Sequence, residues 1–502
     1  MKNFFCLVLG LLVCGLIMAM PESFFITWEI QATAAITTLM VIWWITEAIP
    51  IPATALVPLV GFPLLGVLSP AEAAAPYADK TIFLFLGGFI IAASMQRWNL
   101  HRRIALSIIL LTGTSPKQII LGFMVATAFI SLWISNTATA MMMIPIAVAI
   151  IGTIGVDAFR DHAGEKSGLD FAKALVISIA YAASIGGLGT IIGSPPNGIF
   201  LAQLKTLFPG APTIDFVDWM LFGIPLVAIF IPLTWAWLVY GPYRHLPAQL
   251  PHSREVINEE LKKLGRITVG ERWTLMVFVM TALMWIFSKT KNIGDITIPG
   301  LDILFPGLDD STIAMFGAIL LFLLPVSIKA RQYTMDWESV LKIPWGILIL
   351  FGGGICLSKG FIKSGLADEL VKHLTALSIL DVLLIVLLVA VLVSFLTEVT
   401  SNTAIASVMM PILAVASVSL MINPVILMLT AALTASLAFM LPVATPPNAV
   451  AYSTGFISMQ DIMKTGFILN FIGVLLVTLF MYTVILWALG ISFDLPAWAT
   501  AP

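Results

Sequence analysis

One short polar motif, Ser-Asn-Thr, occurs twice in this chain, and each copy stands between long apolar segments. The copies begin at Ser135 and Ser401, and each is followed by a Pro-Pro-Asn sequence, at Pro195 and Pro446 respectively. Tandem prolines remove backbone donors and interrupt a helix, which frees carbonyl oxygens. Carbonyl, hydroxyl and amide oxygens are suitable ligands for a hard cation such as sodium. Paired interruptions in the two halves of an apolar chain indicate the binding site of a transporter.

The same motifs predict groups that attract an anion. Ser, Asn and Thr are favoured at helix N-caps, so each triplet is expected to cap the helix that follows it. Each Pro-Pro-Asn sequence is likewise expected to begin a new half-helix. Four helix N-termini that point at one place would stabilise negative charge there. One site could therefore hold an anion beside sodium, and we expect no Lys or Arg side chain to contact that anion.

The composition places these motifs in a membrane. Of the 502 residues, 60% are hydrophobic and 10% are charged, and the mean hydropathy is +1.04. A soluble globular chain has about 25% charged residues. We expect an all-α polytopic protein of the cell inner or plasma membrane, with no nucleic-acid partner. Several apolar runs approach the roughly 20 residues that span a bilayer, among them residues 28–44, 119–134, 219–240 and 467–489.

The sequence lacks the motifs of common enzyme classes. The three cysteines form no CxxC pair, the five histidines lie in polar connecting stretches, and no HExxH or Walker motif occurs. An enzyme is therefore not expected, and a channel is the rival class, which counterflow and saturable uptake would separate from a carrier. Glu398 is an intramembrane acid, a type of residue that is often functional. Its counterpart in the first half is Leu132, so we interpret Glu398 as a structural hydrogen-bonding residue outside the symmetric site.

The placement of Lys and Arg predicts the orientation, because these residues concentrate in cytoplasmic connections. Basic residues flank residues 118–154 on both sides, so this segment is expected to enter and leave the membrane from the cytoplasmic side. Basic residues also fill residues 241–272, which are expected to lie in the cytoplasm. Residues 208–218 and 292–310 contain no Lys or Arg and are expected outside. This assignment inverts the second triplet relative to the first, which predicts an inverted-topology repeat. The basic flanks fit either two full spans or a re-entrant hairpin, and residues 4–18 fit a first helix or a signal peptide.

At these residues the chain resembles the divalent anion/sodium symporter family, which includes bacterial and animal sodium-coupled dicarboxylate carriers. The resemblance covers nearly the whole length and rests on both triplets, both Pro-Pro-Asn sequences and the segment Trp-Ile-Thr-Glu-Ala-Ile-Pro at residues 44–50. It implies an inverted-repeat transporter of about 11 transmembrane helices that works as an elevator. A scaffold domain would form a homodimer, and a transport domain would move. Two re-entrant hairpins, residues 118–154 and 379–420, would carry the triplets at their tips.

The resemblance also divides the chain into four regions. The scaffold would comprise residues 1–110, with the first-repeat scaffold helices and a connecting surface helix, and residues 211–375, with further scaffold helices, the cytoplasmic connection 241–272 and the start of the second repeat. The transport domain would comprise residues 111–210, with hairpin 118–154 and a broken helix at 173–206, and residues 376–502, with hairpin 379–420, a broken helix at 424–457 and the last helix.

Two sodium sites and one substrate site follow from the resemblance. The first sodium site falls on Ser131, Ser135, Asn136 and Gly193. The second falls on Thr397, Thr400, Asn402 and Ala444, partly through backbone carbonyls, and Thr400 is expected to act through its carbonyl. The carboxylates of the substrate would meet Asn136, Thr137, Ser194, Asn402, Thr403, Thr445 and Pro446.

The expected function is sodium-coupled symport of C4-dicarboxylates such as succinate, malate and fumarate. The alternative within transport is a sodium-independent dicarboxylate exchanger, or a carrier of another divalent anion such as citrate or sulfate. In family members that exchange citrate or tartrate for succinate, the second Pro-Pro-Asn is replaced, so its presence in both halves favours sodium coupling. Sodium is the only cofactor that we expect.

Overall fold

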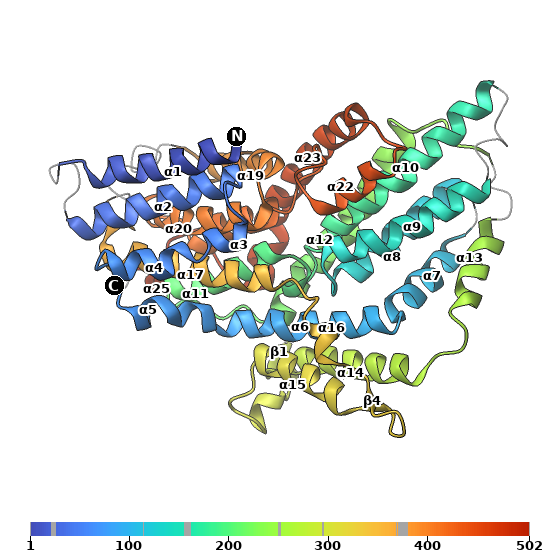
Figure 1. Cartoon of the computed structure of the whole chain (residues 1–502), viewed down its shortest axis with the longest axis horizontal. Helices are drawn as coiled ribbons and strands as arrows, with labels where there is room; N and C mark the ends of the chain where they lie inside the picture. The colour runs from blue at the N-terminus through green and yellow to red at the C-terminus, as the bar shows by residue number, and fades with distance from the viewer. Residues whose placement is uncertain are drawn as a thin grey trace.

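The structure is a computed structural model that describes residues 2–21, 27–113, 115–154, 162–248, 253–293, 296–367, 369 and 380–500. Helices make up most of these residues, and the strands form two small antiparallel sheets of two strands each. Figure 1 shows an elongated bundle in which most of the long helices lie along the longest axis. The mostly helical fold that the composition predicts is confirmed.

The elements of the first half are α1 (Lys2–Met18), α2 (Trp28–Thr46), α3 (Ile51–Thr54), α4 (Val57–Leu64), α5 (Pro70–Ala74), η2 (Ala75–Ala78), α6 (Lys80–Arg97), α7 (Leu100–Thr112), α8 (Pro116–Ser131), α9 (Asn136–Ile154), α10 (His162–Gly186), η4 (Ile191–Gly193), α11 (Pro195–Leu207) and α12 (Phe216–Tyr240).

The remaining elements are α13 (Ser253–Lys263), α14 (Val269–Ile286), β1 (Lys291–Ile293), β2 (Ile296–Ile298), η5 (Leu301–Ile303), α15 (Asp310–Leu323), β3 (Pro325–Ser327), β4 (Gln332–Tyr333), α16 (Trp337–Val340), α17 (Trp345–Ser364), α19 (Val382–Val399), α20 (Asn402–Ser419), α21 (Pro424–Thr434), α22 (Pro446–Ser453), α23 (Met459–Phe480), the π-helical turn η7 (Met481–Ile485), α24 (Leu486–Leu489) and α25 (Ala497–Thr500).

The described residues contain nine helices that are long and apolar enough to cross a membrane. They carry many exposed large apolar side chains, as on α12, α14 and α19, which is the surface expected to meet lipid. Several helices around the two motifs are shorter. The 11 residues of α21 are one example. At 1.5 Å per residue α21 covers about half of a hydrocarbon core roughly 30 Å thick. The chain is thus a multi-pass membrane protein that also contains apolar helices too short to span a bilayer.

Each Ser-Asn-Thr motif lies between two consecutive helices that contact each other. The first lies between α8 and α9, and the second between α19 and α20. Ser115 and Gln118 form a capping box at the start of α8, so this hairpin begins at Pro116 rather than at residue 118. Asp381 caps α19, and residue 379, the expected start of the second hairpin, lies outside the described residues. Figure 1 shows α8 and α9 in the right half of the view and α20 in the left half, with α19 nearer the middle.

The helical structure is interrupted just before both Pro-Pro-Asn sequences. Residues 187–194 separate α10 from α11, and residues 435–445 separate α21 from α22. The glycine at the end of α10 allows a close approach to α8, because a Cβ on Gly186 would lie 2.5 Å from the carbonyl oxygen of Ala128. The first broken helix is longer at its start than expected, since α10 begins at His162.

Candidate functional site

At the first motif a hydroxyl and two backbone carbonyl groups lie within hydrogen-bond distance of a side-chain amide. The hydroxyl of Ser131 lies 2.7 Å from Oδ1 of Asn136 and 2.7 Å from the carbonyl oxygen of Ala183, yet it has a single proton to donate. Oδ1 of Asn136 also lies 3.0 Å from that carbonyl and 3.2 Å from the carbonyl oxygen of Gly193. Two arrangements satisfy these atoms. Either the amide rotates and its nitrogen donates to both carbonyls, or a cation takes its place among the oxygens.

The second motif repeats this pattern. The hydroxyl of Thr397 faces Oδ1 of Asn402 and, at 2.9 Å, the carbonyl oxygen of Ala435. Five residues separate the hydroxyl from the asparagine in each half, and both hydroxyl residues are fully buried. Hydroxyl, amide and carbonyl oxygens, without sulfur or imidazole, are the ligands of hard cations. The residues of both clusters therefore fit sodium.

A side-chain amide holds each helix break open in the same way. Nδ2 of Asn197 donates to two carbonyl oxygens of the first break, at residues 187 and 190, over 2.9 and 2.8 Å. Nδ2 of Asn448 donates to the carbonyl oxygens at residues 438 and 441, both over 3.1 Å. The donor lies 10 and 7 residues after its acceptors in both halves. These asparagines are the last residues of the two Pro-Pro-Asn sequences, so each sequence fixes the loop that it follows.

The two halves meet at the breaks. The hydroxyls of Ser194 and Ser436 lie 2.9 Å apart and join the first break to the second. Helix α9, which follows the first triplet, packs against α22, and α20, which follows the second triplet, packs against α11. The helices that begin at the four motifs are therefore neighbours, each half contributing to both contacts.

Capping differs between the two triplets. The hydroxyl of Ser135 accepts a hydrogen bond from the N–H group of Ala138 at 3.4 Å, so the first triplet caps α9 as expected. The expectation was wrong for the second triplet, because Ser401 makes no side-chain capping bond and adopts φ −66° and ψ 128°. Helices α11 and α22 also begin without a side-chain cap. Uncapped N–H groups stay available to a ligand.

Other expected site residues take different positions. The hydroxyl of Thr400 donates to the carbonyl of Leu396 at 2.9 Å, which turns it back onto its own helix. The hydroxyl of Thr445 is buried and has no hydrogen-bond partner among the described residues, as a group reserved for a ligand would. Thr137 and Thr403 are half-buried, and Pro446 is exposed.

A pocket of about 580 Å³ reaches the first triplet. Ser135 and Thr137 line it at the start of α9, and Gln96, Arg97 and Lys342 line it at the end of α6 and before α17. Arg97 belongs to the basic stretch before residues 118–154, and Lys342 follows Lys329 and Arg331, so the distribution of basic residues predicts that both lie on the cytoplasmic side. Neither residue was expected near the site, because both served only to predict the orientation of the chain in the membrane. An ion pair of 2.5 Å joins Arg97 to Asp336.

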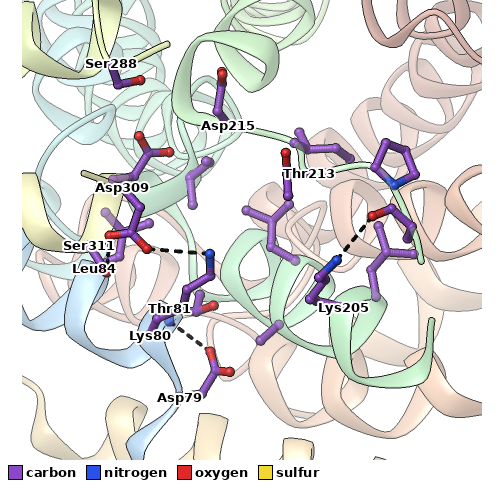
Figure 2. A pocket seen from close by; sticks show the side chains of 18 of the residues that line it. Asp79, Lys80, Thr81, Leu84, Lys205, Thr213, Asp215, Ser288, Asp309 and Ser311 are labelled. Carbon is purple, nitrogen blue, oxygen red and sulfur yellow. Dashed lines mark hydrogen bonds and ion pairs between the residues drawn. The ribbon is translucent and has the colours of Figure 1, made fainter. Parts of the chain in front are cut away.

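A second pocket, of about 260 Å³, lies at the opposite end of α6 (Figure 2). Its basic side chains already have partners: Lys80 pairs with Asp309 at 3.5 Å, Lys289 pairs with Asp215 at 3.7 Å, and Lys205 donates to a backbone carbonyl. Four aspartates and three lysines line this pocket, so acidic groups exceed basic ones and a dianion is disfavoured. None of the expected site residues lies in it.

Solved structures with this fold are transporters. YdaH of Alcanivorax borkumensis matches with a TM-score of 0.54 at 15% identity, over 89% of this chain and 98% of that chain. MtrF of Neisseria gonorrhoeae, described as illuminating a class of antimetabolite efflux pumps, matches with a TM-score of 0.54 at 10% identity, over 84% of each chain. At these identities the likeness shows the fold alone, which is that of a polytopic membrane protein.

The chain belongs to the sodium:sulfate symporter family, whose transmembrane-region model matches residues 1–490. A sodium-dependent dicarboxylate transporter, SdcS of Staphylococcus aureus strain bovine RF122, is 43% identical over 495 residues, which cover 97% of this chain and 93% of the relative. SdcS of Staphylococcus saprophyticus is 42% identical over 471 residues, which cover 92% and 87% respectively. These matches confirm the resemblance, and the relatives are transporters rather than enzymes.

Proposed function

We propose that this protein is a sodium-coupled symporter of C4-dicarboxylates such as succinate, malate and fumarate. The observation that carries the proposal is the pair of matched oxygen clusters at Ser131 and Thr397, in each of which a buried hydroxyl lies within hydrogen-bond distance of an asparagine amide and a backbone carbonyl. The relatives that are 42–43% identical are named sodium-dependent dicarboxylate transporters, and this favours a dicarboxylate over the sulfate of the family description.

Sodium would bind at the two clusters. The first site comprises Ser131, Ser135, Asn136 and Gly193, and the second comprises Thr397, Thr400, Asn402 and Ala444. The geometry adds one carbonyl oxygen to each cluster, from Ala183 and Ala435.

The substrate would lie between the clusters, where α9 meets α22 and α11 meets α20. Its carboxylates would contact Asn136, Thr137, Ser194, Asn402, Thr403, Thr445 and Pro446, with one mirror threonine for each carboxylate. A dianion in the membrane interior carries a desolvation cost of roughly several kcal/mol per charge. Sodium should therefore bind first and offset this cost together with the helix N-termini.

The architecture proposed for this function is an inverted repeat that works as an elevator, in a homodimer. The scaffold would be residues 1–110 and 211–375, and the transport domain residues 111–210 and 376–502. Two observations support a repeat: the equal spacings of the asparagine bonds, and the reciprocal packing of α9 on α22 and of α20 on α11. The pocket from Arg97 to Thr137 supports an inward-facing state, because its basic lining is predicted to be cytoplasmic.

Reconstitution into liposomes tests the function. Labelled succinate should accumulate when sodium is higher outside, and not when choline replaces sodium. Unlabelled malate and fumarate should compete with it, whereas sulfate and citrate should compete weakly. Tight succinate binding to purified protein in choline alone would contradict sodium coupling and would favour the exchanger. Uptake that never saturates with succinate would favour a channel.

A further inference from the structure

Glu398 of α19 is almost completely buried, and its carboxylate lies against the second helix break. Oε1 accepts hydrogen bonds from the backbone N–H groups of Phe439 (2.7 Å) and Met440 (3.0 Å). Oε2 accepts from Met440 (3.0 Å) and Leu441 (3.1 Å). Nδ2 of Asn470 in α23 donates to Oε1 at 2.7 Å. Three consecutive N–H groups directed at one acceptor form a small anion-binding nest, and the chain fills it with its own carboxylate.

The nest arises because residues 435–445 have left helical geometry. N–H groups released from a helix inside a membrane need another acceptor, since lipid offers none. Side chains hold the carbonyl groups of the same stretch: Asn448 donates to two of them, and the hydroxyl of Tyr181 donates to that of Phe439 at 3.0 Å. The second break is therefore bound on both its donor and its acceptor side.

The first break is anchored without a charge. Leu132 stands four residues before Asn136, as Glu398 stands four residues before Asn402, and its side chain has no acceptor. Its backbone carbonyl instead accepts a hydrogen bond from the hydroxyl of Thr190. The same hydroxyl accepts from the N–H group of Gly193 at 3.1 Å. The first break is thus held by a neutral hydroxyl group, whereas the second is held by a carboxylate.

We propose that Glu398 is the positioning residue of the second sodium site. Its neighbour Thr397 supplies the hydroxyl of that site, and its carboxylate fixes the segment that ends three residues before Ala444. Because Thr397 and Glu398 are adjacent in α19, this part of the helix sets the distance between the Thr397 hydroxyl and the loop that leads to Ala444. Hydrogen bonds to a carboxylate are stronger than those to a neutral acceptor, which suits a loop with no helix to support it. The inference rests on the proposed sodium coupling, but the anchoring of the loop can be measured without it.

The test compares Glu398→Gln with Thr190→Val, which removes the anchor of the first break. The glutamine keeps the size of the side chain but turns an NH₂ group toward N–H donors. Two quantities are measured on purified full-length protein: hydrogen exchange of residues 436–445, and the sodium concentration that gives half of the sodium-induced rise in Tm. Glu398→Gln should accelerate exchange in that segment and raise this concentration about tenfold or more. Thr190→Val should leave exchange of residues 436–445 unchanged.

Two further variants keep the test decisive. Glu338→Gln removes an exposed glutamate of α16 and should change neither quantity. Asn470→Ala removes one of the donors to Glu398 and should give a smaller shift in the same direction if Glu398→Gln does not fold. Unchanged exchange of residues 436–445 in Glu398→Gln, or in Asn470→Ala where Glu398→Gln does not fold, would overturn the proposal. A wild-type Tm that ignores sodium would refute the sodium coupling, and the exchange data would still decide whether Glu398 anchors the break.

Discussion

Gly187 offers a direct test of the first oxygen cluster. A Cβ at this position would lie 2.6 Å from Oδ1 of Asn136 and 3.0 Å from the carbonyl oxygen of Gly193, both closer than ordinary van der Waals contact. Gly187→Ala must therefore displace the amide from the cluster. Overpacking of this kind costs about 1–3 kcal/mol. Because 1.4 kcal/mol is tenfold in affinity, sodium binding at this site should weaken about 5- to 150-fold.

Sodium titrations of purified protein, followed by tryptophan fluorescence or by Tm, measure this loss. The matched control is Gly152→Ala in α9, since a Cβ there would meet no atom within 4 Å. Gly152→Ala should leave sodium affinity unchanged. In Gly187→Ala, succinate binding should be weak at low sodium and should recover at high sodium. If Gly187→Ala folds and binds sodium like the wild type, or if Gly152→Ala shows the same loss, the cluster is not a sodium site.

Three other perturbations have defined outcomes. Thr137→Val and Thr403→Val should each weaken succinate binding about tenfold, for the loss of one hydrogen bond to a charged group, and leave sodium binding by the empty carrier unchanged in the same titrations. Equal losses of sodium affinity would contradict the assigned roles. The pKa of Glu260 is below its ordinary value of 4.5, first because Lys263 donates a hydrogen bond to it and also because Arg102 lies beside it. Its contribution to the docking of α13 on α7, within about 1 kcal/mol, is present above about pH 4.5 and is lost as the pH falls through the lower folded-state pKa. Hydrogen exchange of residues 253–263 should therefore increase more on acidification in the wild type than in Glu260→Gln. An equal increase in both would show that the Glu260 carboxylate does not stabilise this contact.

The breaks could be located from the sequence because their signals are local. Polar triplets and tandem prolines are rare in apolar segments, and the structure places an interruption at each of them. Helix ends were harder to predict from the sequence. Residue 162 starts α10 in a polar stretch with no apolar periodicity, and the side chain of Ser401 leaves its helix uncapped although its residue type favours a cap.

The hydrogen-bond partners of the site residues could not be predicted from the sequence. Ala183 and Ala435 contribute carbonyl oxygens, and the identity of a residue says nothing about the use of its backbone. The contact between Ser194 and Ser436 depends on how the two halves pack. The sequence could name Glu398 as a hydrogen-bonding acid, but its acceptors face a loop some 40 residues away.

The asparagine bonds across the two breaks have a thermodynamic consequence. Asn197 and Asn448 fix the loops from which the carbonyl and hydroxyl ligands project, so these loops lose little conformational entropy when a ligand arrives. Such preorganisation predicts binding with little backbone ordering and a heat-capacity change no larger than the buried apolar surface requires. Loops held in this way resist local opening, so the proposed alternating access would be expected to use movement of intact helices, with an activation enthalpy that reflects helix sliding rather than local unfolding.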